Sequence, residues 1–317
     1  MKVKYFIIIS TIGFCLSQDF NQMRSNPIQG FTVSPNKNKM RISTHYTYVG
    51  ANEIFDWNGD IWKDGDTILY TNTLGDTLID TLELNFKQNT LIINLDYLGS
   101  HNVGVYLKTP ITFNREINSI TVGEYGLGDL SFGIYFLWEQ FFKTQRIKTG
   151  AFYKRAKSGL PGDLAVHYTG TGQNNFGFDM AIDLLLSEKL NLSLKQVTTF
   201  NGNATYPIPT TEDTVSLAPS TTFDLKARVI YNFTTNLSFG LDYTYQSFSS
   251  ILDDYAQSTG FISGIKPMIG YKLLSEISLG YVNIESFNLI GSWTIILKGE
   301  SYYKPNIFQL GTQFYFN

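Results

Sequence analysis

The segment from residue 174 to 195, NNFGFDMAIDLLLSEKLNLSLK, alternates between large apolar side chains and small or polar ones. One set of alternate positions is entirely large and apolar: Phe176, Phe178, Met180, Ile182, Leu184 and Leu186. The other set holds Gly177, Asp179, Ala181, Asp183 and Leu185. A helix would place Asp179 and Asp183 on one face, as in an amphipathic surface helix. The split at a period of two is cleaner, so the segment is predicted to be a β-strand with one apolar and one polar face.

The same alternation recurs along the chain. It is found in residues 40–49, 89–98, 102–113, 129–138, 145–155, 190–195, 222–231, 236–248, 260–272, 276–284 and 306–317. Aromatic residues make up 15% of the chain, yet the mean hydropathy is only −0.08. After the N-terminus, no stretch approaches the ~18–20 continuous apolar residues of a membrane helix. Strands with one face toward lipid and one toward water produce this combination.

The connections between these segments alternate between short and long. Short ones lie at 99–100, 140–144, 187–189, 234–235 and 274–276, and long polar ones at 50–88, 114–126, 156–173, 201–220, 249–259 and 285–305. This pattern is typical of a membrane barrel with tight periplasmic turns and longer external loops. The sequence therefore predicts an all-β fold, a transmembrane antiparallel up-and-down β-barrel of about 12 strands over residues 40–317. The alternative of 14 strands applies if residues 289–297 form part of a further hairpin.

The N-terminus has the features of a secretory signal peptide. Lys2 and Lys4 precede an apolar run from residue 6 to 16, and Cys15 and Ser17 are small residues before a cut at Gln18. We expect residues 1–17 to be removed and residues 18–39 to form a periplasmic segment. Cleavage removes the only cysteine, so the mature chain does not depend on disulfides. Export and alternation together predict a location in the outer membrane of a Gram-negative cell.

Glycine recurs at equivalent places in several of the predicted strands. The patterns LSFG at 130–133 and 237–240, ISLG at 277–280 and FQLG at 308–311 each put the glycine on the polar face. Glycine usually weakens a strand, so its repeated use on one face indicates sharp curvature or a need for room on that side.

Charged residues lie on the polar faces of four consecutive predicted strands. They are Asp179, Asp183, Lys195, Asp224, Lys226, Arg228 and Asp242. In a barrel these faces point into the lumen, where such groups can select solutes along the pathway. Alternatively they form ion pairs that fill and stiffen the interior. The mixed signs on neighbouring strands favour pairing.

Signals for catalysis or metal binding are weak. His45 shares a strand face with Ser43, but no third residue completes a hydrolytic arrangement, and His101 and His167 lie in connections. The stretch DWNGDIWKDGD at 56–66 has the D-x-N-x-D spacing of a calcium loop. Ile61 stands where such a loop requires glycine, and a turn-rich external loop is the better interpretation. We expect no enzymatic activity, no bound metal and no cofactor.

Two stretches resemble a known family. Residues 126–137 (GLGDLSFGIYFL) and 158–182 (SGLPGDLAVHYTGTGQNNFGFDMAI) resemble outer-membrane transporters assigned to the MetA pathway of phenol degradation, which are loosely related to FadL-type channels for hydrophobic compounds. This resemblance implies uptake of small hydrophobic or aromatic molecules. The chain departs from the family in its long Asp-rich loop over residues 50–88, and it shows no clear N-terminal plug motif.

Two functions are compatible with these features. The first is a channel or transporter for small, hydrophobic or aromatic molecules, with outer-membrane lipid and a small-molecule solute as its partners. The second is a non-conducting barrel that serves as an anchor or as a subunit of a secretion or adhesion assembly, whose protein partner the sequence does not identify. The formal charge of −3, which becomes −5 without Lys2 and Lys4, argues against nucleic acid as a partner.

Overall fold

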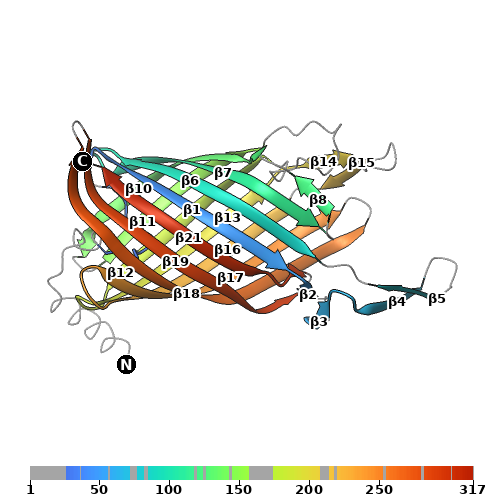
Figure 1. The fold of residues 1–317 in the computed structure, drawn as a ribbon. Helices are drawn as coiled ribbons and strands as arrows, with labels where there is room; N and C mark the ends of the chain where they lie inside the picture. The colour runs from blue at the N-terminus through green and yellow to red at the C-terminus, as the bar shows by residue number, and fades with distance from the viewer. Residues whose placement is uncertain are drawn as a thin grey trace, which may run out of the picture.

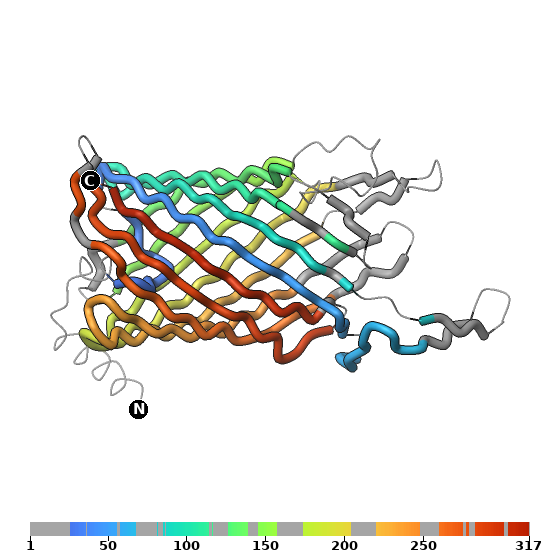
Figure 2. The backbone as a smooth tube through the Cα atoms, viewed as in Figure 1, coloured from blue at the N-terminus to red at the C-terminus, as the bar shows by residue number. Residues whose placement is uncertain are grey.

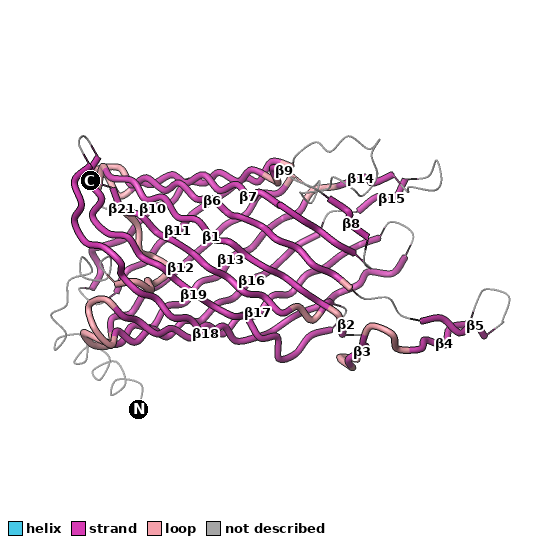
Figure 3. Tube along the Cα trace, in the orientation of Figure 1, coloured by secondary structure: helices cyan, strands magenta, loops and turns pink. Residues whose placement is uncertain are grey.

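The computed structural model describes residues 26–35, 37–55, 58–71, 77–81, 85–117, 120–123, 126–142, 145–156, 174–207, 214–217, 220–252, 255–279, 282–300 and 302–316. The predicted signal peptide and its cleavage site lie outside these ranges, as does His167. Strands account for nearly all the regular structure in the described part, and loops gather at the two ends of the molecule (Figure 3). No helix in these ranges is long and apolar enough to cross a membrane.

Twelve antiparallel strands of the described chain close into a barrel (Figure 1). They are β1 (Lys39–Ala51), β6 (Phe86–Leu98), β7 (Val103–Ile117), β10 (Leu130–Phe142), β11 (Gln145–Arg155), β12 (Asn175–Leu185), β13 (Leu190–Asn201), β16 (Ser220–Asn232), β17 (Leu237–Leu252), β18 (Tyr255–Leu279), β19 (Val282–Glu300) and β21 (Asn306–Phe316). Each strand pairs with its neighbours in this order, and β1 closes the barrel by pairing with β21 from Met40↔Phe316 to Gly50↔Asn306. The predicted up-and-down barrel is confirmed.

The remaining short strands extend the barrel at one end. They are β2 (Glu53–Phe55), β3 (Ile61–Lys63), β4 (Thr67–Thr71), β5 (Thr77–Thr81), β8 (Ile120–Gly123), β9 (Gly126–Leu127), β14 (Ala204–Pro207), β15 (Thr214–Leu217) and β20 (Tyr302–Tyr303). In Figure 2 the blue trace of β2 and β3 lies just beyond the right-hand rim of the barrel, where β1 ends. The tight turns and the end of β21 lie at the opposite rim, which we call the turn end (Figure 1). In one of these turns Asn102 takes a left-handed backbone conformation with φ of 62°.

The alternation places the apolar faces on the outside of the barrel. Phe176, Phe178 and Met180 on β12 are 51%, 55% and 46% exposed, whereas Asp183 on the other face is fully buried. Outward residues of the other strands, such as Ile134 and Leu241, are exposed in the same way. A continuous apolar outer surface of this kind is stable only against lipid, so the barrel is built for a membrane.

The bounds of β18 and β19 differ from the prediction. The predicted turn at 274–276 and loop at 285–305 are wrong, because β18 runs on to Leu279 and β19 spans residues 282–300. A register shift between Lys272 and Leu274 reverses the alternation within β18, so Leu273 and Leu274 are both exposed. Such a bulge resembles a strand end in the sequence. The apolar stretch 289–297 is the middle of β19 and adds no hairpin, and residues 249–259 also lie mostly in strands.

The inward glycines make room for aromatic rings on the neighbouring strand. A Cβ atom on Gly104 would overlap the ring of Tyr135, and one on Gly133 would overlap the ring of Tyr106. Both residues pair directly across β7 and β10, as Gly104↔Tyr135 and Tyr106↔Gly133. The glycines on the polar face thus provide the room that the sequence predicts.

Candidate functional site

A short N-terminal segment lies inside the barrel at its turn end. We call residues 26–35 the inner segment. Its side chains Ile28, Thr32, Val33 and Ser34 are almost completely buried. Ile28 packs on Ile230 and Met268 of the wall. The sequence shows no clear plug motif in residues 18–39, which it predicts to form a periplasmic segment; residues 26–35 of this stretch lie in the lumen.

Asp183 holds the centre of the inner segment. Its carboxylate accepts hydrogen bonds from the backbone N–H of Phe31 (2.9 Å) and of Thr32 (3.0 Å) and from the Thr32 hydroxyl (2.5 Å). Gly30 lies so close to this carboxylate that a Cβ there would collide with it. A buried carboxylate is stable only when it is hydrogen-bonded, and here backbone donors of the inner segment supply those bonds.

Arg228 makes a second connection between the wall and the inner segment. It donates two hydrogen bonds to Asp242 across β16 and β17, at 2.7 and 2.8 Å, and a third to the Gln29 carbonyl at 2.7 Å. Its guanidinium also lies 4.3 Å from the centre of the Phe31 ring. Lys266 approaches the same carboxylate of Asp242 at 3.6 Å. Arg228 therefore joins a buried ion pair to the backbone of the segment.

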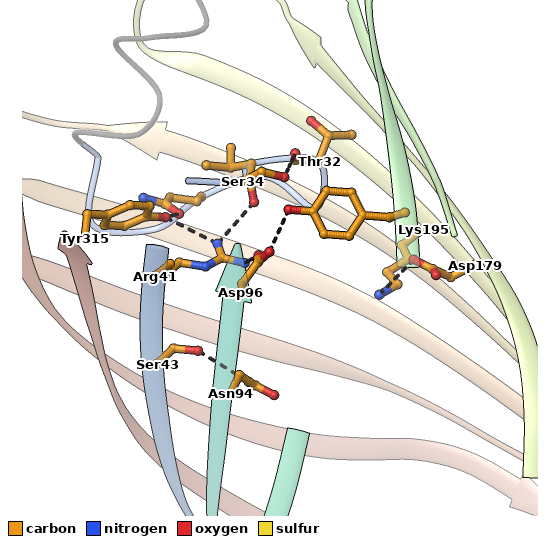
Figure 4. Close-up of polar contacts among 12 residues, drawn as sticks. Thr32, Ser34, Arg41, Ser43, Asn94, Asp96, Asp179, Lys195 and Tyr315 are labelled. Atoms are coloured by element: carbon orange, nitrogen blue, oxygen red, sulfur yellow. Dashed lines mark hydrogen bonds and ion pairs between the residues drawn. The ribbon is translucent and has the colours of Figure 1, made fainter. Parts of the chain in front are cut away.

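A third connection involves Arg41, which the sequence analysis did not select. Arg41 donates to the Val33 carbonyl at 3.1 Å and forms an ion pair with Asp96 at 2.5 Å (Figure 4). The Tyr135 hydroxyl donates to the other oxygen of Asp96 at 2.6 Å. Arg41 and Asp96 are direct partners in the β1–β6 register, and both follow the alternation to the polar face. The polar-face position of each was visible in the sequence, but their pairing depends on the strand register.

The lumen holds a cavity of about 380 Å³, whose lining includes Arg41, the residue that contacts the inner segment at Val33. We call it the lumen cavity. It is lined by Arg41, Asn94, Asp96, Tyr106, Lys108, Ser131, Lys148, Phe152, Asp179, Lys195, Val197, Asp224 and Lys226. Lys195 and Asp179 form an ion pair at 3.7 Å on its wall, on the side away from Arg41 (Figure 4). The cavity is open enough for a small organic molecule, and its wall carries charged, polar and aromatic groups.

The seven residues predicted from the sequence lie in two places, the lumen cavity and the surroundings of the inner segment. Asp179, Lys195, Asp224 and Lys226 line the lumen cavity. Asp183 and Arg228 contact the inner segment, and Asp242 pairs with Arg228. The interpretation that lumen charges pair holds for Lys195–Asp179 and for Arg228–Asp242. Asp183 instead binds backbone, which no sequence pattern indicates.

The remaining sequence candidates do not form a reactive site in the described ranges. His45 lies on the lumen wall, where its ring occupies the space beside Gly311. His101 lies in the turn between β6 and β7. No group of three or more potential ligands that could hold a metal ion occurs among the described residues. After β3, the Asp66 carboxylate accepts a hydrogen bond from the backbone N–H of Lys63 at 2.7 Å, as in a tight turn. Asp56 lies outside the described residues.

Comparisons with known proteins bear on the fold. No protein-family model and no curated protein matches the chain. An outer membrane channel from Pseudomonas putida F1 superposes with a TM-score of 0.66 at 12% identity, covering 91% of this chain and 98% of that one. The chain has the fold of an outer-membrane channel. The Pseudomonas putida toluene transporter TodX and the KdgM porin are more distant. TodX has a TM-score of 0.41 at 9% identity, covering 95% of this chain and 94% of its own. KdgM has a TM-score of 0.42 at 8% identity, covering 86% and 98%.

Proposed function

We propose that this protein is an outer-membrane channel through which small molecules cross by way of the lumen cavity. The observation that carries the proposal is the cavity of about 380 Å³ inside a barrel whose outer surface is apolar. A barrel of about eight strands is just wide enough for side chains to fill, and a wider one leaves free space unless a plug fills it. Here the inner segment fills one end of a twelve-strand barrel and the cavity remains beside it, and a polar lumen with free space is the usual construction of a solute channel.

The class of solute follows from the wall of the cavity and from the sequence resemblance. Tyr106, Phe152 and Val197 give part of the wall an apolar character. Residues 126–137 and 158–182 resemble transporters for small hydrophobic or aromatic compounds. Both features support a small organic solute with an apolar or aromatic body, such as a compound of one ring.

The orientation in the membrane follows from the loop lengths. Tight turns of outer-membrane barrels face the periplasm and the longer loops face outside. The inner segment then lies at the periplasmic exit of the lumen, and the strands β2 to β5 lie outside the cell. A solute that enters from outside reaches the lumen cavity before it meets the inner segment.

The second candidate is a barrel that anchors an assembly without conducting. The observation in its favour is the inner segment, which is hydrogen-bonded to Asp183, Arg228 and Arg41 and occupies the exit. In a channel this segment must move aside or leave a passage beside it. In an anchor it would stay in place.

Swelling of proteoliposomes distinguishes the two functions. The mature chain, residues 18–317, is refolded into liposomes, and entry of neutral and charged solutes of one-ring size is followed by light scattering. A channel admits some of these solutes faster than protein-free liposomes do. Liposomes that contain folded barrel and admit none of them, with or without residues 18–35, would favour the anchor.

A further inference from the structure

Basic side chains outnumber acidic ones on the wall of the lumen cavity. The basic residues are Arg41, Lys108, Lys148, Lys195 and Lys226, and the acidic ones are Asp96, Asp179 and Asp224. Two of the three carboxylates are already engaged, Asp96 by Arg41 at 2.5 Å and Asp179 by Lys195 at 3.7 Å. Asp224 is the only remaining acid among these lining residues. The wall therefore has an excess of positive charge that protein carboxylates do not balance.

Three lysines carry this excess. Among the described residues, Lys108, Lys148 and Lys226 have no carboxylate within ion-pair distance. Lys148 is only 9% exposed, and its ammonium lies 3.7 Å from the centre of the Tyr135 ring. A ring face carries only a partial negative charge, so this contact offsets only part of the cost of burying the ammonium. Lys148 thus faces the cavity with capacity to bind an anion.

The strand register brings two of the basic groups together. Lys195 on β13 and Lys226 on β16 are direct partners across the ladder. Like charges at directly opposite positions destabilise an antiparallel pair. Asp224 pairs with Val197, one step along the same face, and so lies diagonal to Lys195. Asp224 also lies two residues from Lys226 on β16, and Asp179 pairs with Lys195. Within the described chain Lys226 has no ion pair of its own, so an anion beside it would relieve the remaining repulsion between the two lysines.

The shape of the cavity restricts the anion to a small organic one. A volume of about 380 Å³ exceeds what an inorganic ion needs and suits a molecule of about ten non-hydrogen atoms. Phe152 and Val197 line the same space and favour an apolar body. A neutral hydrocarbon would leave the lysines without a partner, and a cation would be repelled by them.

We propose that the lumen cavity binds small organic carboxylates, with the carboxylate held by Lys108, Lys148 and Lys226 and the apolar body against Phe152. This inference rests on the proposed channel function for its physiological meaning, but the site itself is a property of the cavity. It narrows the solute class from small aromatic or hydrophobic molecules to those that carry a negative charge.

Calorimetric titration of the refolded mature protein in detergent tests the site directly. Benzoate is the probe, and benzamide is its neutral counterpart of equal shape. The double variant Lys108→Gln/Lys226→Gln removes two charges and keeps two polar side chains that are one atom shorter. Lys63→Gln is the control, because Lys63 lies in β3 outside the barrel. We expect benzoate to bind at least tenfold more tightly than benzamide, because hydrogen bonds to charged groups are stronger than neutral ones. The double variant should lose that preference, and the control should keep it.

Equal binding of benzoate and benzamide, or unchanged benzoate binding in the double variant, would overturn the proposal. A gel-mobility assay for the folded barrel ensures that the variants are compared in the same state. Planar-bilayer recordings separate this inference from the channel function. Conduction without benzoate binding would support the channel function and contradict the proposed carboxylate site. Benzoate binding without conduction would support the carboxylate site and contradict the channel function.

Discussion

Replacement of Asp183 by alanine should release the inner segment from the lumen. The carboxylate of Asp183 accepts three hydrogen bonds from Phe31 and Thr32, and it is fully buried. Hydrogen bonds to a charged group contribute about 1.5–3 kcal/mol each. Water that enters the space left by the side chain replaces some of them, so we take about 3 kcal/mol for all three. At about 1.4 kcal/mol per tenfold change, the ratio of released to inserted segment should rise about a hundredfold.

Cysteine labelling measures this ratio. The only cysteine of the chain, Cys15, lies in the predicted signal peptide, so Ser34→Cys would place a single thiol in the mature protein. Ser34 is fully buried in the inserted state. A water-soluble maleimide should therefore react slowly with Ser34→Cys alone and about a hundredfold faster when Asp183→Ala is added, because labelling follows the open population.

Asp224→Ala is the matched control, since Asp224 is a lumen carboxylate that lines the cavity and, in the described part of the chain, has no hydrogen bond to the inner segment. It should leave the labelling rate unchanged. Equal rates in Ser34→Cys with and without Asp183→Ala would refute the conclusion that this carboxylate holds the segment. Fast labelling of Ser34→Cys alone would show that the segment is outside the lumen even with Asp183 present.

Three further predictions concern the stability of the barrel. Gly104→Ala should destabilise the fold by about 1–3 kcal/mol, because the new Cβ overlaps the ring of Tyr135, and urea unfolding followed by gel mobility should show the loss. Arg228→Ala should lower the stability of the barrel by about 3 kcal/mol, the lower end for a broken buried ion pair, because Lys266 still faces Asp242. The double variant with Asp242→Asn should recover part of this stability in the same assay. Phe178→Arg puts a charge on the lipid face of β12. It should make folding into vesicles less favourable by about 2–4 kcal/mol near the bilayer centre, and titration of the folding yield with urea would detect this loss of stability.

The fold was largely predictable because the period-two alternation carries its main constraint. Phe178 outward and Asp179 inward follow from position alone once the segment is a strand. The alternation fails where a bulge shifts it, as between Lys272 and Leu274, where two consecutive leucines are exposed. In the sequence a bulge shows only as a loss of the alternating pattern, so the ends of β18 and β19 are predicted at the wrong residues.

The site was predictable only as a set of inward charges. The partner of Arg228 follows from the β16–β17 register, in which it is opposite Asp242. The partner of Asp183 could not be found, because its hydrogen bonds go to the backbone of Phe31 and Thr32, more than 150 residues away in the chain. The inner segment has no alternation and no motif, so only its position in the folded barrel shows its role.

The channel function is tested most directly by recording current across a planar bilayer that contains the refolded mature chain, residues 18–317. A lumen that passes solutes predicts discrete, stable conductance steps, which should be larger or longer-lived with Asp183→Ala because the inner segment leaves the exit. Insertion of folded barrel without conductance steps, in both the natural chain and the Asp183→Ala variant, would contradict the proposal of a channel.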